Sequence, residues 1–232
     1  MSIQWHIQPD GVVGAEALAD AVAAALQQVL AQKGSAVLAV SGGRSPIAFF
    51  KALSQKTLDW DKISVTLVDE RLVPVNHADS NTGLVREYLL QNRAQAAKWL
   101  PLVGDDADEA ALADTAQTVV EALQHFRQPD VLVLGMGGDG HTASLFPQAP
   151  QLAQGLDSHA GLLLHTTPVT APYERISMTL AAIENTAHVF LAIAGTEKKA
   201  VLQQAQAAVN QTYPISYVIH SEKVATHVFY NE

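Results

Sequence analysis

Short apolar runs alternate with longer helical segments along most of this chain, and this alternation limits the folds that it can adopt. Continuous apolar runs such as Ala36–Val40 are typical of strands that are buried on both faces of a parallel sheet. Segments with helical periodicity, such as Ile47–Leu53 and Ser80–Leu90, follow these runs. The pattern predicts an α/β fold: a doubly wound, mostly parallel sheet with helices on both faces.

The remaining elements follow from the same patterns. The other expected strands are Ile3–Ile7, Ile63–Val68, Val131–Leu134, Leu162–His165, Ile176–Thr179, Val189–Ala194 and a last edge strand in Thr226–Glu232. The other expected helices are Ala15–Gln32, Asp108–Phe126, Glu197–Ala208 and a short helix that Pro147 ends. Because the sequence has neither an internal repeat nor a flexible linker, we expect one domain over residues 1–232.

Composition narrows the possible partners. The chain has 14 basic and 23 acidic residues, so its net charge is −9, which argues against nucleic acid and anionic membranes as partners. A small anionic ligand stays possible, because a few local cations decide its affinity. The absence of cysteine excludes disulfides and thiolate nucleophiles. With neither a signal peptide nor an uninterrupted apolar run of transmembrane length, we expect a soluble cytoplasmic protein, and we expect a monomer.

Four unusual segments follow predicted strands directly: "SGGRSP", "DER", "GMGGDGH" and "GTEKK". Ligands of open α/β sheets bind outside the carboxyl ends of the strands. The predicted fold therefore gathers these four segments on one edge of the sheet.

The segment "SGGRSP" places Ser41, Gly42 and Gly43 before a helix. Backbone N–H groups at a helix N-terminus bind phosphate well, because unpaired donors and the helix dipole both favour an anion. An ordinary strand-to-helix turn is an equally good interpretation of this segment alone.

The segment "GMGGDGH" matches the G-x-G-x-x-G spacing of dinucleotide-binding loops. That fingerprint usually opens the first strand–helix unit and continues into a long helix, whereas two units precede this segment and Pro147 lies seven residues after Gly140. The match is therefore weak evidence for a nicotinamide cofactor, and we expect no cofactor.

Asp139 and His141 lie on the same loop and are separated by Gly140. A histidine at a ligand-binding edge can act as a general base, and a carboxylate can orient it. The pair could also be half of a metal site, but no further ligand motif accompanies it, so we expect no metal.

The segment "DER" places Asp69 and Arg71 directly after an apolar strand. These charges form either a structural set of salt bridges or a catalytic group. In the catalytic interpretation, Arg71 stabilises an oxyanion and Asp69 orients the Arg71 side chain. Arg175 and Lys198 are further cations near the ends of predicted elements.

Together these motifs resemble the family of 6-phosphogluconolactonases and glucosamine-6-phosphate deaminases. The resemblance rests on "SGGRSP", "LVDERLVP", "SNTGLVREYLL", "DVLVLGMGGDGHTASLFP", "ERISMTLAAI" and "GTEKKAVL", which occur in the order of the family between about residues 35 and 205. The resemblance implies the Rossmann-like fold of that family. Arg44 departs from the family pattern, in which Ser or Thr is commoner, and its cation could contact a phosphate.

The resemblance implies hydrolysis of 6-phospho-D-glucono-1,5-lactone. His141 would activate water, Asp139 or Asp69 would orient His141, and Arg71 would face the oxyanion. The phosphate would bind at Ser41–Gly43, with Arg175 and Lys198 as cationic contacts. Deaminases of the family place an acid where this chain has Phe146, so a deaminase or isomerase is the second hypothesis. A sensor of sugar phosphates that lacks catalysis is the third.

Overall fold

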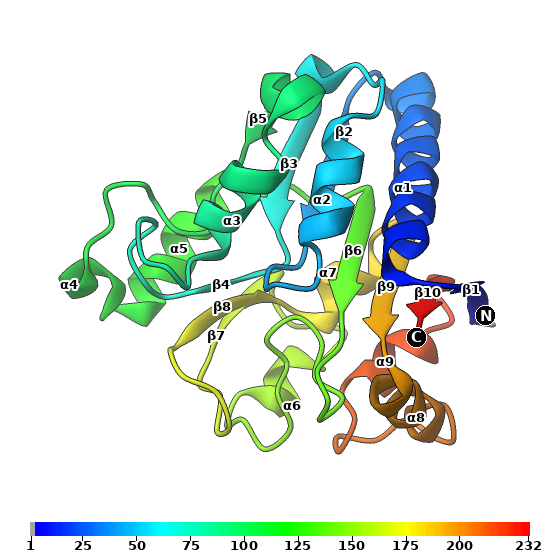
Figure 1. The fold of residues 1–232 in the computed structure, drawn as a ribbon. Helices are drawn as coiled ribbons and strands as arrows, with labels where there is room; N and C mark the ends of the chain where they lie inside the picture. The colour runs from blue at the N-terminus through cyan, green and yellow to red at the C-terminus, as the bar shows by residue number, and fades with distance from the viewer. Residues whose placement is uncertain (1–2) are drawn as a thin grey trace.

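A computed structural model describes residues 3–232, in which seven strands form a parallel sheet (Figure 1). The strand order is β1-β10-β9-β6-β2-β3-β5, and each neighbouring pair is parallel. These strands are β1 (Gln4–Gln8), β2 (Ala36–Val40), β3 (Ile63–Leu67), β5 (Lys98–Trp99), β6 (Val131–Gly135), β9 (His188–Ala194) and β10 (Thr226–Asn231). The predicted fold class is confirmed.

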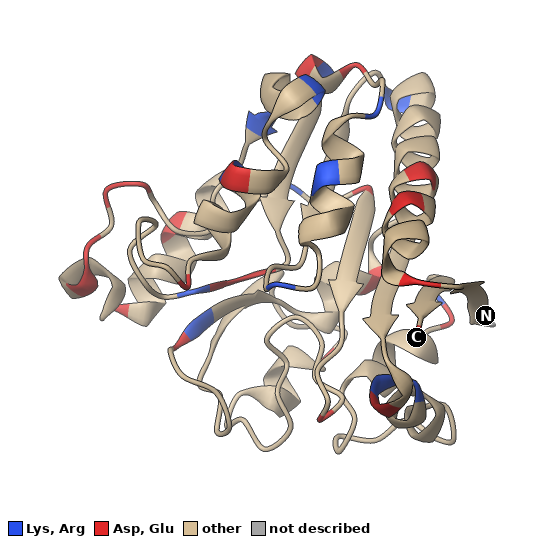
Figure 2. Cartoon of the chain, viewed as in Figure 1, with Lys and Arg blue, Asp and Glu red and all other residues tan. Residues whose placement is uncertain are grey.

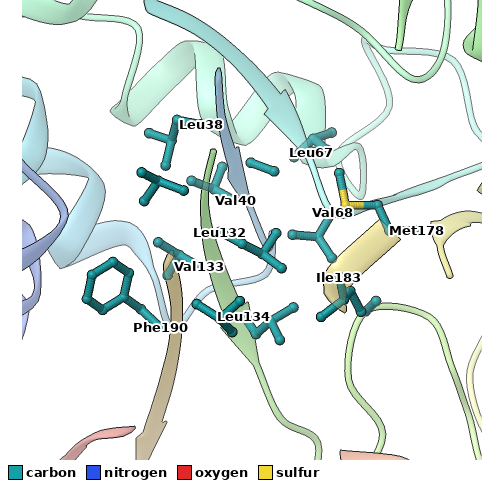
Figure 3. Packing of buried hydrophobic residues seen from close by; sticks show 14 of the residues in the cluster. Leu38, Val40, Leu67, Val68, Leu132, Val133, Leu134, Met178, Ile183 and Phe190 are labelled. Atoms are coloured by element: carbon teal, nitrogen blue, oxygen red, sulfur yellow. The ribbon is translucent and has the colours of Figure 1, made fainter. Parts of the chain in front are cut away.

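Helices cover both faces of this sheet, with α1 and α2 in front of it and α7 behind it in Figure 1. The helices are α1 (Gly11–Lys33), α2 (Ile47–Ser54), α3 (Asn81–Tyr88), α4 (Glu109–Leu112), α5 (Thr115–His125), α6 (Leu152–Gly155), α7 (Leu180–Glu184), α8 (Thr196–Ala205) and α9 (Ile215–Ile219). Two short 3-10 helices lie at Trp60–Lys62 and Asn92–Ala96. The central strands are buried on both faces as a result, and Figure 3 shows Leu38, Val40 and Leu132 in this core.

A second, antiparallel sheet has the strand order β4-β8-β7, with β4 at Asp69–Arg71, β8 at Arg175–Met178 and β7 at Leu163–Thr166. The sequence predicts β7 and β8 as strands but does not predict that they form a sheet separate from the parallel one. It also ends a strand before "DER", where the structure begins a new one. Apolar alternation identifies a strand, but the choice of partner strand depends on contacts that are distant in sequence.

Three other predicted elements differ from the structure. The helix expected over Asp108–Phe126 is divided into α4 and α5, because the Asp114 side chain accepts a hydrogen bond from the backbone of Gln117 and starts a new helix. The last strand, β10, is an interior strand between β1 and β9 rather than an edge strand. No helix follows the glycine loop directly, since Ala143 has a φ of +50° and Thr142 forms a bridge with Leu145.

Helix α1 begins at the capping residue Asp10 and ends at Gly34, whose φ of +76° suits a glycine. It is the one helix within residues 3–232 that is long and apolar enough to span a membrane by length and composition. Its buried residues, which include Leu18, Val22 and Leu26, belong to the hydrophobic core. Through these residues one side of α1 packs on the parallel sheet, in contact with β2, β9 and β10.

Candidate active site

A cavity of about 980 Å³ lies at the carboxyl ends of the parallel strands. Its lining includes the segment after β2, the segment after β6, the end of β9 and residues of β4 and β8. Figure 2 shows charged residues on β4 and at the start of β8, beside this edge of the sheet. The site residues predicted from sequence that line the cavity are Ser41, Gly42, Gly43, Asp69, Arg71, His141, Arg175 and Lys198.

The loop after β6 holds His141 against Asp139. The Asp139 carboxylate accepts hydrogen bonds from the backbone N–H of His141 at 3.1 Å and from the ring Nδ1 at 2.6 Å. Partial burial works to raise the pKa of Asp139, but the hydrogen bond and charge of His141 outweigh it and lower that pKa. The ionised carboxylate therefore favours the tautomer with hydrogen on Nδ1, which leaves Nε2 as a proton acceptor.

Tight packing fixes the His141 ring. The ring stacks on Phe146 with 4.1 Å between the ring centroids. A Cβ added to Gly137 would lie 2.2 Å from the ring atoms Cε1 and Nδ1, so this glycine makes room for the imidazole. The turn itself is closed by a hydrogen bond from the Gly137 N–H to the carbonyl of His141, and Gly140 adopts a φ of +80°.

Asp69 has other partners. Its buried carboxylate accepts a hydrogen bond of 2.5 Å from the hydroxyl of Ser144, and its charge works to keep nearby Arg175 protonated. Of the two carboxylates proposed to orient His141, the structure therefore pairs Asp139 with the imidazole and Asp69 with Ser144.

Arg71 is held by neutral acceptors. Its Nη1 donates to the carbonyl of Asp79 at 2.6 Å and to the Asn81 Oδ1 at 3.1 Å. Among the ion pairs formed by the described residues, none includes an acid or base of the "DER" segment. The described residues therefore do not form the salt-bridge set that was the alternative interpretation of this segment. The N–H groups of Arg71 other than those on Nη1 are available to a ligand in the cavity.

Glu70, the middle residue of "DER", holds neighbouring parts of the site together through hydrogen bonds. Its buried carboxylate accepts hydrogen bonds from the backbone N–H groups of Arg71, Asn81 and Thr82 and from the hydroxyl of Ser80. Burial raises the pKa of Glu70, and the backbone hydrogen bonds oppose that rise. Glu70 thus ties β4 to the start of α3.

Asn81 lines the cavity, although the sequence places it only inside the expected helix Ser80–Leu90. Its side chain is buried, donates from Nδ2 to the carbonyl of Asp69 and accepts from Arg71. A Cβ on Gly42 would lie 2.0 Å from the Asn81 Oδ1, so the turn after β2 and the Asn81 amide fit together only with glycine at this position. No local pattern in the sequence indicates these partners, because they come from three separate segments.

The turn after β2 supplies backbone donors. The Ser41 N–H donates to the carbonyl of Val133 at 2.9 Å, which corrects the expectation that this amide is available to a phosphate. The Ser41 hydroxyl accepts from the Gly135 N–H, so Ser41 anchors the turn to β6. The amides of Gly42 and Gly43 have no acceptor within residues 3–232.

Three cations were expected near this turn. Arg175 is buried, and its guanidinium donates to the carbonyls of Pro172 and Tyr173. Lys198 lies in the first turn of α8, and burial lowers its pKa. Arg44 is exposed and does not belong to the cavity lining. In the part of the chain that the structure describes, no group of three His, Cys, Asp or Glu residues is placed to hold a metal ion.

The parallel sheet and its edge cavity define an α/β protein of the class that binds small ligands outside the carboxyl ends of its strands. A family model described as glucosamine-6-phosphate isomerases/6-phosphogluconolactonase matches residues 9–228. The chain belongs to this family.

Relatives of known name agree with this assignment. The chain is 62% identical to a 6-phosphogluconolactonase of Neisseria meningitidis over 229 residues, which cover 98% of this chain and 99% of the relative. It is 45% identical to a 6-phosphogluconolactonase of Helicobacter pylori, over 83% of this chain and 82% of the relative.

Solved structures show the same fold. A crystal structure of a protein from Neisseria gonorrhoeae, described as a 6-phosphogluconolactonase, superimposes with a TM-score of 0.97 at 62% identity, over 99% of this chain and 100% of that chain. A 6-phosphogluconolactonase from Shewanella baltica gives 0.91 at 37% identity, over 100% of this chain and 98% of that chain. A monomeric glucosamine-6-phosphate deaminase, at 16% identity and a TM-score of 0.72, shares the fold.

Proposed function

We propose that this chain hydrolyses 6-phospho-D-glucono-1,5-lactone to 6-phospho-D-gluconate. The names of its relatives support this reaction, and one feature of the site favours it over deamination. The Phe146 ring stacks on His141, at the position where the resemblance places an acid in the deaminases. An apolar ring there cannot transfer the proton that deamination needs.

In the proposed mechanism, Nε2 of His141 accepts a proton from a water molecule as its oxygen attacks the lactone carbonyl. Ionised Asp139 holds the imidazole and stabilises its positive charge. The free N–H groups of Arg71 stabilise the tetrahedral oxyanion. When the ester bond breaks, the ring oxygen takes the proton from His141 and leaves as a hydroxyl group, and the new carboxylic acid loses its remaining proton to water. The proposed steps use no metal ion.

The phosphate of the substrate would bind at the other part of the cavity. The amides of Gly42 and Gly43 would donate to its oxygens, with Arg175 and Lys198 as charged partners. Binding energy from this remote group would place the carbonyl against His141. All of these groups belong to one chain, so we expect a monomer to be active, and we expect it to act in the cytoplasm.

The assay of lactone loss against its spontaneous hydrolysis tests this function. We expect the purified protein to accelerate the loss well above the background. A rate equal to the background would contradict the proposal. Release of ammonia from glucosamine 6-phosphate would instead support a deaminase, and binding of 6-phosphogluconate without turnover would support a sensor.

The phosphate site predicts a pH dependence of anion binding. Because burial lowers the pKa of Lys198, this lysine loses its charge at a lower pH in the unliganded protein than a solvent-exposed lysine does. A bound phosphate favours the charged form, so affinity is greatest below the lowered pKa and falls as the pH rises through it. We expect calorimetry with inorganic phosphate to show tighter binding at neutral pH than at a higher pH, with the fall beginning below the pH at which an unburied lysine loses its charge.

Lys198→Met should bind phosphate about tenfold more weakly at the lower pH and lose most of this pH dependence. Lys199→Met is the matched control, because the Lys199 ammonium lies 4.6 Å from the centre of the Tyr230 ring and does not line the cavity. Equal affinities of wild type and Lys198→Met for phosphate would contradict the proposal that Lys198 binds the phosphate.

A further inference from the structure

Arg71 and Arg175 face each other across two antiparallel strands. They are direct partners in the register of β4 and β8, and both line the cavity. Like charges at directly opposed positions repel. Burial is the main cause that lowers the pKa of Arg175; the charge of Asp69 opposes this effect, and the charge of Arg71 adds to it. Two neighbouring guanidinium groups need fixed acceptors if they are to keep one geometry in the absence of an anion.

Backbone carbonyls from two loops supply these acceptors. Asp79, in the loop 72–80 between β4 and α3, accepts from Arg71 at 2.6 Å. Pro172 and Tyr173, in the loop 167–174 between β7 and β8, accept from Arg175 at 2.9 and 3.3 Å. Arg71 also donates to the Asn81 Oδ1 in α3, so its placement depends on that residue and on the loop 72–80. The placement of Arg175 depends on the loop 167–174.

One side-chain hydrogen bond joins the two loops. The Tyr173 hydroxyl donates to the Asp79 carboxylate at 2.9 Å, and the Tyr173 ring meets the His77 ring edge-to-face at 5.5 Å. Tyr173 also has a φ of +69°, a conformation that a bulky residue adopts only when its surroundings hold it there. Asp79 and Tyr173, the two residues that make this bond, are also two of the three residues whose carbonyls accept from the arginines, the third being Pro172.

We propose that the Tyr173–Asp79 hydrogen bond positions Arg71 and Arg175 relative to each other, so that Arg175 binds the phosphate of the substrate while Arg71 faces its lactone carbonyl. The pair acts through the two arginines, and Tyr173 and Asp79 are positioning residues. This inference rests on the proposed lactonase function for its kinetic consequence and on the geometry of the two loops for its structural basis.

The test compares Tyr173→Phe, Asp79→Ala, Asp79→Asn and the double variant Tyr173→Phe/Asp79→Ala. Tyr173→Phe and Asp79→Ala each remove the hydrogen bond, and each should raise KM about three- to tenfold. Asp79→Asn keeps an acceptor oxygen and should stay within about twofold of wild type. Because both changes break one bond, the double variant should match the more affected single variant.

Tyr88→Phe is the control, because it removes a hydroxyl from α3 at a position outside the cavity lining. We expect its KM and kcat to equal those of wild type. A loss of folded protein would lower kcat without changing KM, so the rise in KM separates positioning from a structural role. An unchanged KM in Tyr173→Phe, or effects that multiply in the double variant, would overturn the proposal.

Calorimetry with inorganic phosphate separates this proposal from the function on which it rests. If wild type has no lactonase activity, the proposed function fails, and the phosphate affinities of wild type and Tyr173→Phe decide the present inference. Weaker binding by Tyr173→Phe, with an unfolding temperature equal to that of wild type, would support positioning. Equal binding would contradict it.

Discussion

Replacing His141 with alanine is expected to reduce kcat for lactone hydrolysis by at least about a hundredfold. The substitution removes the only group proposed to take a proton from water, while Arg71 and the turn proposed to bind the phosphate stay in place. KM should change little, because the phosphate contacts are remote from the imidazole. The measurement is the initial rate of lactone loss, corrected for spontaneous hydrolysis.

His159→Ala is a matched control for this variant. Asp157 and His159 repeat the Asp-x-His spacing of the active loop, and the Asp157 carboxylate likewise accepts a hydrogen bond from the His159 backbone at 2.9 Å. The His159 side chain is 92% exposed, against 29% for His141, and lies outside the cavity lining. We expect wild-type kinetics for His159→Ala. A wild-type kcat in His141→Ala would contradict the role of His141 as the base.

The contrast between these two Asp-x-His segments shows what the sequence could and could not predict. Local spacing is identical in both, so spacing alone cannot assign a catalytic role. The position of Asp139 and His141 after a buried strand does distinguish them, because parallel strands bring their carboxyl ends to one edge. Most of the site residues predicted in this way do line one cavity, although they come from distant segments.

Contacts between segments account for what was missed. Asn81 lies between Arg71, the carbonyl of Asp69 and the turn at Gly42, and Glu70 binds the start of α3. Neither arrangement follows from helical or strand periodicity, since each depends on which loops meet after folding. The same limit applies to the β4-β8-β7 sheet, whose strands are recognisable from sequence although their pairing is not.

The glycine loop illustrates a further limit. The short helix expected after it does not form there, because its residues have partners elsewhere. The Thr142 hydroxyl donates to the carbonyl of Gly135, and the Ser144 hydroxyl donates to Asp69. These contacts, together with the left-handed backbone of Ala143, hold the chain in an irregular path that presents His141 to the cavity. Composition could not indicate that path.

Gly137→Ala is expected to reduce kcat about a hundredfold, although it changes no group that takes part in the chemistry. The added Cβ would lie 2.2 Å from the His141 ring and 2.6 Å from the Asp139 carboxylate. The ring also packs on Phe146, so it can yield only by giving up its hydrogen bond to Asp139 or its stacking. A displacement of about 1 Å at a reacting group costs a rate factor of this size.

Gly138→Ala provides the control at the next position. A Cβ there meets nothing within 4 Å, and the backbone of neither glycine has a positive φ. We therefore expect Gly138→Ala to keep wild-type kinetics and stability, whereas Gly137→Ala should also lose about 1–3 kcal/mol of unfolding free energy through overpacking. The difference between the two variants isolates the steric effect on the imidazole from any general effect of alanine in the loop.

The double variant Gly137→Ala/His141→Ala decides whether the glycine acts through the histidine. If Gly137 only makes room for the imidazole, the double variant should be no slower than His141→Ala, because the group that the methyl displaces is already absent. Multiplying losses would instead show that Gly137 supports a different part of the site. With alanine at position 141 the methyl also meets less resistance, so the unfolding free energy should recover in the double variant relative to the sum of the single changes.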